Sequence, residues 1–273
     1  MSWETTGDVR VFLAAAGPFM RARPAEHTTL LTVAETVSVR GANAFGDEAP
    51  EFGWWRDGDG IAGTFLHTPP YPVLLGPAPD AAGAALLGAL AGRAPDGLNG
   101  PVALVRAVAA THSGPVRERR RECLYRLDEL VDPPLPPGRA VVAGAAHRER
   151  LIEWYGAFAH EIGEVRHSWA EMVDDRLSHD GLHVWESSPD EPVAFAGVSR
   201  QIAGMVRIAP VYTPPEQRGR GIAAALTAAA CRFARQAGAE EILLFADLAN
   251  PTSNGVYRRI GFVPLSERLY VEF

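Results

Sequence analysis

One segment constrains the fold of this chain more than any other. An apolar run over residues 205–212 leads into a Pro-rich turn, then Arg-Gly-Arg-Gly, and then an alanine-rich stretch over residues 221–237. The run is typical of a buried strand, and the alanine-rich stretch predicts a helix. The first amides of a helix have no acceptors within it and lie at the positive end of its dipole, and glycines let a bulky anion approach the backbone. The segment therefore predicts a strand, loop and helix that bind a phosphate group.

Two common phosphate loops do not fit this segment. A Walker loop requires a lysine, and the chain contains none. A dinucleotide fingerprint requires Gly-x-Gly-x-x-Gly near the start of a βαβ unit, whereas Gly219-x-Gly221 is followed by Ala224 and lies near the end of the chain. What remains is Arg218-x-x-Gly221-x-Ala223, which resembles the Q/R-x-x-G-x-G/A pattern of the GNAT N-acetyltransferase superfamily.

A second motif follows at the expected separation. A buried strand is predicted over residues 241–246, and after it the chain reads Asp-Leu-Ala-Asn250-Pro-Thr-Ser-Asn254-Gly-Val-Tyr257-Arg-Arg-Ile-Gly261-Phe. This is similar to the second half of a GNAT cofactor site, with its two Asn, its Tyr and a glycine hinge into the last strand. The chain is therefore identified as a member of the GNAT superfamily, and it resembles a bacterial subgroup that has an extra N-terminal half.

The chain divides at the Pro-rich segment 132–138, because consecutive prolines form a stiff extended spacer. Residues 139–273 show the order β-α-α-β-β-β-α-β-α-β, which the resemblance identifies as the catalytic GNAT domain. Residues 1–131 show a similar order without either motif, and we expect a degenerate GNAT-like domain there. The expected fold class is thus mixed α/β, as a tandem. The basic run 117–121 is interpreted as a solvated stretch before a strand at 123–127.

The resemblance implies attack of a neutral amine on a thioester, which requires stabilisation of an oxyanion and protonation of a leaving thiolate. It also implies that the strand before the loop splays from its neighbour and presents amides to the cofactor. Pro210 cannot donate a ladder hydrogen bond and favours a bulge in that strand. The predicted cofactor-binding residues are Val211, Tyr212, Thr213, Gln217, Arg218, Gly219, Arg220, Gly221, Ile222, Ala223, Asn250 and Asn254.

Each candidate also has a structural interpretation. Asn250 and Asn254 could instead cap the helix that begins after Pro251. Tyr257 is the predicted general acid, because a phenol with a pKa near 10 keeps its proton at neutral pH, although it could simply pack under the last strand. Glu186 is the candidate general base, with His183 as the alternative, and either could be a solvated strand residue. The histidines lack a ligand spacing such as HExxH, so no metal is expected.

Composition narrows the class of protein. A net charge of −7 over 273 residues argues against a nucleic-acid binder, whose surface would carry a basic face. No apolar run is long enough to span a bilayer, and the polar, acidic N-terminal segment is unlike a signal peptide. The chain has only 2 cysteines, far apart in the sequence, which fits a reducing compartment. We expect a cytoplasmic monomer or homodimer.

The resemblance implies an acetyl-CoA-dependent N-acetyltransferase. The acceptor would be a primary amine of a small molecule or peptide, attacking directly in a ternary complex. One alternative is a catalytically silent acyl-CoA-binding sensor or scaffold, and another is an acyltransferase that uses a longer acyl-CoA. The sequence does not identify the acceptor.

Overall fold

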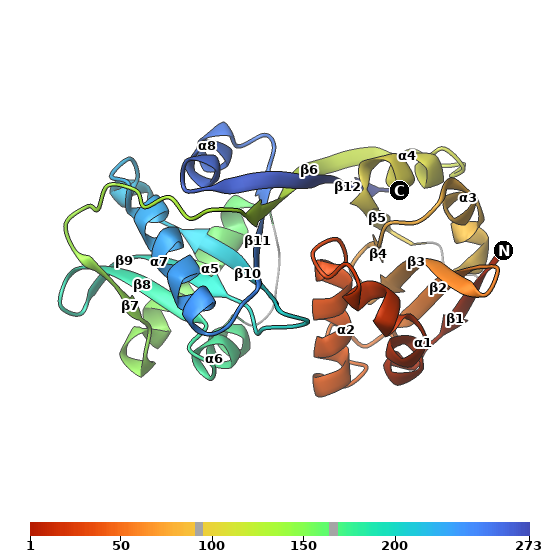
Figure 1. The fold of residues 1–273 in the computed structure, drawn as a ribbon, viewed down its shortest axis with the longest axis horizontal. Coiled ribbons are helices and arrows are strands. Elements are labelled where there is room, and N and C mark those ends of the chain that lie inside the picture. Colours follow the sequence, from red (N-terminus) through yellow and green to blue (C-terminus); the bar gives the residue numbers. More distant parts are fainter. Residues whose placement is uncertain (91–94, 164–168) are drawn as a thin grey trace. The chain divides into compact units, whose positions relative to one another are not determined.

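The computed structural model describes residues 1–90, 95–163 and 169–273 and separates into two compact units (Figure 1). Unit 1 comprises Met1–Leu124, Asp247–Ala249 and Leu265–Phe273, and unit 2 comprises Tyr125–Ala246 and Asn250–Pro264. The segment 132–138 contains no helix or strand and lies inside unit 2. The predicted division into residues 1–131 and 139–273 stays a prediction.

The same order of elements occurs twice along the chain: strand, two helices, three strands, helix, strand, helix, strand. The first set is β1 (Ser2–Thr6), α1 (Val9–Arg21), α2 (Thr28–Arg40), β2 (Glu51–Asp57), β3 (Gly60–His67), β4 (Val73–Leu75), α3 (Asp80–Ala89), β5 (Gly97–Pro101), α4 (Val102–Ala109) and β6 (Arg117–Leu127). The second set is β7 (Arg139–Val142), α5 (Arg148–Glu161), α6 (Ala170–Leu177), β8 (Leu182–Ser188), β9 (Glu191–Val198), β10 (Met205–Tyr212), α7 (Ile222–Gln236), β11 (Glu241–Asp247), α8 (Pro251–Arg259) and β12 (Phe262–Glu272). Short 3-10 turns, η1 (Ala145–His147) and η2 (Pro215–Gln217), precede α5 and α7.

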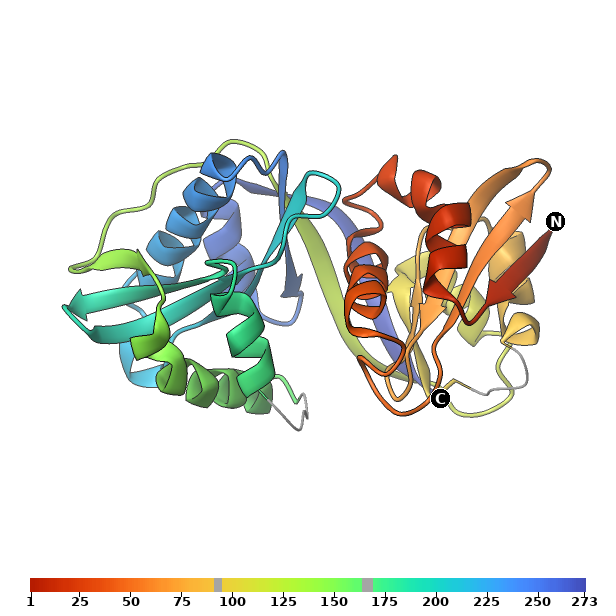
Figure 2. The same ribbon diagram turned by 90° about the horizontal axis from the view of Figure 1, so that it is seen from below.

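In unit 2 the strand order is β11-β10-β9-β8-β7, with β10 parallel to β11 and antiparallel to β9. Helix α7 covers one face of this sheet, and α5 and α6 cover the other (Figure 2). The core beneath α5 is aromatic: the Phe195 ring lies 4.8 Å from that of Tyr155 and 6.2 Å from those of Trp154 and Tyr212. Burial of these rings fixes the C-terminal end of β10, where the glycine loop starts.

In unit 1 the strand order is β1-β2-β3-β4-β5-β12-β6, with residues 117–124 of β6 in this unit. Helices α3 and α4 pack on apolar residues of β3, β4, β5 and β12, while Phe12 of α1 stacks on Phe52 of β2 with ring centroids 5.2 Å apart. The end of β12 is antiparallel to β5, from Arg268 opposite Pro101 to Glu272 opposite Gly97. The last residues of the chain thus complete the sheet of unit 1, and the predicted mixed α/β class is confirmed. Among the described residues, no helix is long and apolar enough to cross a membrane.

Some local predictions were wrong. The run 117–121 is mostly exposed, as expected, but it belongs to β6 instead of preceding the strand. Its arginines pair with carboxylates, Arg119 with Glu272 and Arg121 with Glu267. Two strands were not predicted: β1, which is short and polar, and β5, whose sequence Gly-Leu-Asn-Gly-Pro is typical of a loop. Pairing with β12 and β4 makes β5 a strand, since tertiary contacts override weak local preference.

Gly261 gives a stability prediction for the hinge into β12. Its φ is +101°, and a Cβ there would overlap the carbonyl oxygen of Glu129. We expect Gly261→Ala to lower the free energy of unfolding by about 2 kcal/mol or more, because left-handed strain and a steric overlap add. Urea denaturation followed by circular dichroism measures this.

Gly255→Ala is the matched control. A Cβ at Gly255 would meet only the flexible Arg259 side chain, at 3.2 Å, and the residue lies within α8. Because alanine favours a helix over glycine, we expect the stability to be unchanged or to rise by up to about 1 kcal/mol. Equal losses in the two variants would contradict the assignment of the hinge.

Candidate functional site

The candidate site begins where β10 leaves β11. The two strands pair from Met205 opposite Glu241 to Arg207 opposite Leu243. Beyond this point they share no paired residues in the described part of the chain, although β10 continues to Tyr212 and β11 to Asp247. The facing edges of the two strands therefore separate toward their carboxyl ends, which is where ligands bind in open α/β sheets.

On its other edge β10 carries the bulge that Pro210 predicts. Ile208 lies opposite Val198 and Val211 lies opposite Ala196, so three steps along β10 match two along β9. A bulge bends its strand and re-aims the side chains beyond it. The expectation of a bulge is confirmed.

The loop between β10 and α7 presents a row of backbone donors. Gly219 and Gly221 have φ of +77° and +79°, and Gly221 is the N-cap of α7 without a side-chain capping bond. The amides from Gly219 to Ala224 donate to no acceptor among the described residues, and the first turn of α7 contains no acidic side chain. The hydroxyl of Thr213, at the start of the loop, is also buried without a partner there. Such a loop suits a phosphate group.

The loop arginines make different contacts. Arg218 donates from Nε to the carbonyl of Thr213 at 2.8 Å and from one terminal nitrogen to both oxygens of Glu161, at 2.6 and 2.8 Å. Arg220 makes one long bond, 3.3 Å, to the carbonyl of Glu216. Arg218 is thus held by protein groups of the loop and of α5, and Arg220 is the looser side chain of the two.

The start of α8 adds two asparagines that the structure brings together. Asn250 is the N-cap, and its side-chain oxygen accepts from the amide of Ser253 at 3.0 Å. Asn254 is buried, donates its side-chain amide to the carbonyl of Asn250 at 2.7 Å, and accepts from the hydroxyl of Tyr125 at 2.7 Å. Both asparagines therefore have structural bonds, as the capping interpretation expects for Asn250.

Tyr257 lies one turn further along α8. Its ring meets that of Phe262 edge-on at 6.1 Å, and its hydroxyl has no hydrogen-bond partner among the described residues. Burial raises the pKa of Tyr257 to about 12, because the phenolate would lose its hydration. The phenol is therefore protonated at neutral pH and can donate its proton to a ligand.

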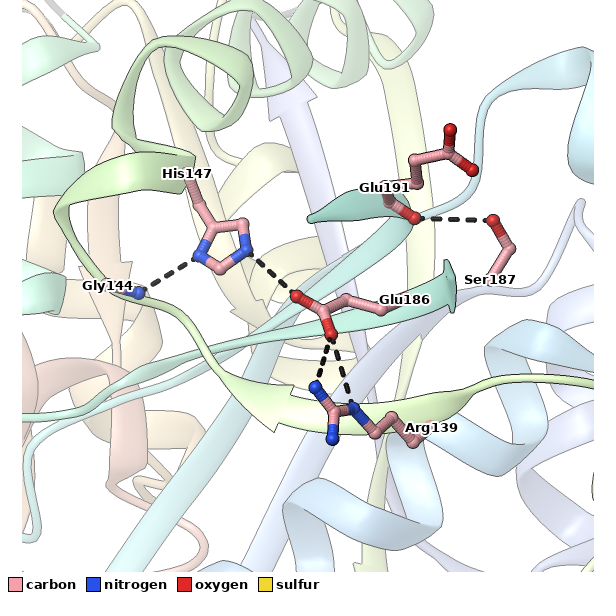
Figure 3. Close-up of polar contacts among 6 residues, drawn as sticks. All are labelled: Arg139, Gly144, His147, Glu186, Ser187 and Glu191. Carbon is pink, nitrogen blue, oxygen red and sulfur yellow. Dashed lines mark hydrogen bonds and ion pairs between the residues drawn. The ribbon is translucent and has the colours of Figure 1, made fainter. Parts of the chain in front are cut away.

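Glu186 belongs to a separate cluster, shown in Figure 3. Its buried carboxylate accepts from Arg139 of β7 at 3.2 and 3.3 Å and lies 3.4 Å from Nε2 of His147, just before α5. Nδ1 of His147 accepts from the amide of Gly144 at 3.1 Å, which places the proton of a neutral ring on Nε2, toward Glu186. The carboxylate thus joins β7, β8 and the start of α5.

Strand register separates Glu186 from the glycine loop. Its partner on β9 is Pro192, whereas Tyr212 at the end of β10 lies opposite Phe195. At ordinary strand spacing Glu186 lies about 10 Å across the sheet and about 10 Å along it from the end of β10. His183, the alternative base, is buried against Phe233 of α7, and burial lowers its pKa to about 4. The structure does not bring either residue to the strand opening.

Two residues that contact the predicted site were not predicted from the sequence. Glu161 contacts Arg218 across 57 positions, and Tyr125 contacts Asn254 across 129 positions. Neither lies in a motif, so only the fold reveals them. Within the described ranges no group of three or more His, Cys, Asp or Glu side chains could hold a metal ion.

Comparison with known proteins agrees with this geometry. Residues 146–262 match the model of the acetyltransferase (GNAT) family. A curated mycothiol acetyltransferase from Saccharomonospora viridis is 34% identical over 139 residues, which are 46% of this chain and 43% of that protein. The chain thus matches less than half the length of this relative.

Two solved structures share the fold of the whole chain. A GNAT-family acetyltransferase from Colwellia psychrerythraea covers 100% of this chain and 99% of its own, with a TM-score of 0.63 at 12% identity. A GCN5-related N-acetyltransferase from Sphaerobacter thermophilus covers 99% and 95%, with a TM-score of 0.65 at 17% identity. The chain has the fold of these GNAT structures, and its residues 146–262 match the GNAT acetyltransferase family.

Proposed function

We propose that the protein is an acetyl-CoA-dependent N-acetyltransferase that acetylates a primary amine of a small molecule or peptide in a ternary complex. The observation that carries this proposal is the separation of β10 from β11 directly before a loop of unpaired amides. Backbone groups without partners on two separating strands can bind an extended chain, and the amides at the start of α7 can bind its phosphates.

The residues present fit acetyl-CoA. The amides of residues 219–223 would hold the pyrophosphate, with the side chain of Arg220 beside a phosphate. Beyond the bulge, Val211, Tyr212 and Thr213 would bond the pantetheine arm, and the buried hydroxyl of Thr213 supplies a donor in need of a partner. Gln217 and the side-chain nitrogen of Asn250 would complete the cradle. Bound acetyl-CoA supplies the acetyl group as a thioester.

Tyr257 would donate a proton to the departing thiolate. Its raised pKa keeps the proton in place, and its hydroxyl has no competing partner within the described residues. A general acid of this kind contributes about 10²-fold or more to a rate. A silent acyl-CoA sensor would need the loop but not this phenol, so Tyr257 favours an enzyme over the sensor. An acyltransferase that uses a longer acyl-CoA remains the second candidate function among enzymes.

For residues 1–131 we propose a degenerate GNAT-like domain. It repeats the element order of the second half, but the link from β4 to α3 is short, and Asp80 stands in the first turn of α3. A carboxylate at a helix N-terminus disfavours a phosphate there. Cys123 and Cys231 are both buried and form no disulfide, which supports a reducing compartment, and we propose the cytoplasm.

The first experiment measures CoA release from acetyl-CoA with a panel of amines, amino acids, peptides and mycothiol-type compounds, the last because of the relative's name. We expect acceptor-dependent release, with kcat about a hundredfold lower in Tyr257→Phe because the thiolate loses its acid. Because the pKa of Tyr257 is about 12, kcat/KM should rise with pH as the acceptor amine loses its proton, without a fall up to about pH 10.

Tyr270→Phe is the matched control, since Tyr270 bonds Glu272 in unit 1 and should leave kcat unchanged. Protein that binds acetyl-CoA but releases no CoA with any acceptor would favour the sensor. If CoA is released only from a longer acyl-CoA and not from acetyl-CoA, the protein would instead be an acyltransferase for longer acyl groups.

Gly221 tests the phosphate loop. Gly221→Ala places a methyl group on the backbone that the pyrophosphate would approach, so we expect the dissociation constant of CoA to rise about tenfold. The fold should lose only about 1 kcal/mol, because a Cβ at Gly221 meets nothing within 4 Å and only the left-handed backbone is strained. Isothermal titration calorimetry measures the affinity, and Gly88→Ala in α3, equally free of contacts, should bind as the unmodified protein does.

For Glu186 we propose a structural role. Glu186→Gln should lower the free energy of unfolding by about 1 kcal/mol, because the charged partner of Arg139 is lost, and should leave the pH profile of kcat/KM unchanged. Glu191→Gln, in the adjacent β9 strand and exposed, is the control for both measurements. Loss of the rise in kcat/KM at acidic pH in Glu186→Gln alone would instead identify Glu186 as the general base.

A further inference from the structure

We propose that Tyr125 is a positioning residue for the transfer reaction, because its buried hydroxyl fixes α8 and therefore the place of Asn250 and Tyr257. The proposal rests on the proposed function of this site. Tyr125 lies on β6, outside both sequence motifs and outside the segment that matches the family model. All the residues concerned belong to unit 2.

The evidence starts with a chain of short hydrogen bonds. Tyr125 is completely buried, and its hydroxyl donates to the side-chain oxygen of Asn254 at 2.7 Å. The side-chain nitrogen of Asn254 donates to the backbone carbonyl of Asn250, also at 2.7 Å. A buried amide that uses its oxygen and its nitrogen in this way has one fixed orientation.

A second contact docks the same face of α8 on the same ring. The guanidinium carbon of Arg258 lies 5.9 Å from the ring centroid of Tyr125. Positions four apart share one face of a helix, so Asn250, Asn254 and Arg258 form one stripe along α8. Tyr125 therefore contacts α8 at two positions one turn apart, Asn254 through a hydrogen bond and Arg258 through a cation–π contact.

These contacts indicate different roles for the two asparagines. Both polar ends of the Asn254 side chain are bonded within the protein, so Asn254 holds the helix rather than the cofactor. Asn250 uses only its side-chain oxygen, on Ser253, and its side-chain nitrogen donates to no acceptor among the described residues. Of the two asparagines, Asn250 is then the one whose side-chain nitrogen can bind acetyl-CoA.

The position of α8 also sets the position of the acid. Tyr257 follows Asn254 by nearly one helical turn, and its hydroxyl lies about 9 Å from the helix axis. A rotation of α8 by about 10° would move that oxygen by about 1.5 Å on this radius. Displacements of about 1 Å can lower a rate by up to about 10²-fold.

The test compares Tyr125→Phe with Tyr155→Phe. Both residues are fully buried tyrosines of unit 2, but the hydroxyl of Tyr155 has no hydrogen-bond partner among the described residues and lies on α5. We expect kcat to fall about tenfold in Tyr125→Phe, with the dissociation constant of acetyl-CoA changed less than about threefold. Tyr155→Phe should stay within about twofold of the unmodified protein in both. Rates are corrected for the folded fraction measured by circular dichroism.

A double-mutant cycle shows whether Tyr125 acts through the acid. In a Tyr257→Phe background, Tyr125→Phe should lower kcat by less than about twofold. The Tyr257 hydroxyl is already missing there, so a shift of α8 cannot lower kcat further through it. A full tenfold loss in that background would overturn the proposal. So would an unchanged kcat in folded Tyr125→Phe, or an equal fall in Tyr155→Phe.

Crystal structures of the two variants give a readout that does not depend on activity. We expect α8 to shift against β11 and β6 in Tyr125→Phe and to stay in place in Tyr155→Phe. An unmoved α8 in Tyr125→Phe would overturn the positioning role. If the unmodified protein transfers no acetyl group, the proposed function fails, and the displacement of α8 still decides whether Tyr125 positions the helix.

Discussion

The structure of unit 2 depends on one constraint: β10 cannot maintain regular hydrogen bonding with both β9 and β11 along its whole length. Pro210 has no amide hydrogen, and the strand forms a bulge against β9 while its pairing with β11 ends at Leu243. Buried backbone groups require partners, so this break is stable only where something else can bond them. Aromatic packing under α5 fixes the end of β10, and the glycine loop follows directly.

Much of this arrangement could be predicted from the sequence because its signals are local. The run of β10 and the alanine-rich α7 show strong periodic patterns, and their ends in the structure match the predicted ends within a residue. Gly219 and Gly221 marked the turn because only glycine adopts a positive φ without strain. The fold class that these motifs predicted is confirmed, and the GNAT family model matches residues 146–262, the part of the chain that contains them.

The rest depends on contacts between distant positions, which periodicity does not encode. Tyr125 and Glu161 have no local signal, and their roles come from partners that the fold brings to them. From the sequence, Glu186 was a strand carboxylate that could border the acceptor site. The register of β8, β9 and β10 instead places it beyond the end of β10. Strand β5 was also missed because its pairing depends on distant residues. Glycine is required at Gly97 because a Cβ there would overlap the carbonyl oxygen of Val271 in β12.

The pairing of β12 with β5 has a consequence for how the protein is made. Unit 1 contains most of the first half of the chain, yet the strand between β5 and β6 is supplied by residues 268–272. Domains normally fold in turn as they leave the ribosome. Here the edge of β5 that pairs with β12 has no β12 partner until the second half has been synthesised. The first half therefore leaves the ribosome with an open β-sheet edge, which exposes unpaired backbone groups to other chains.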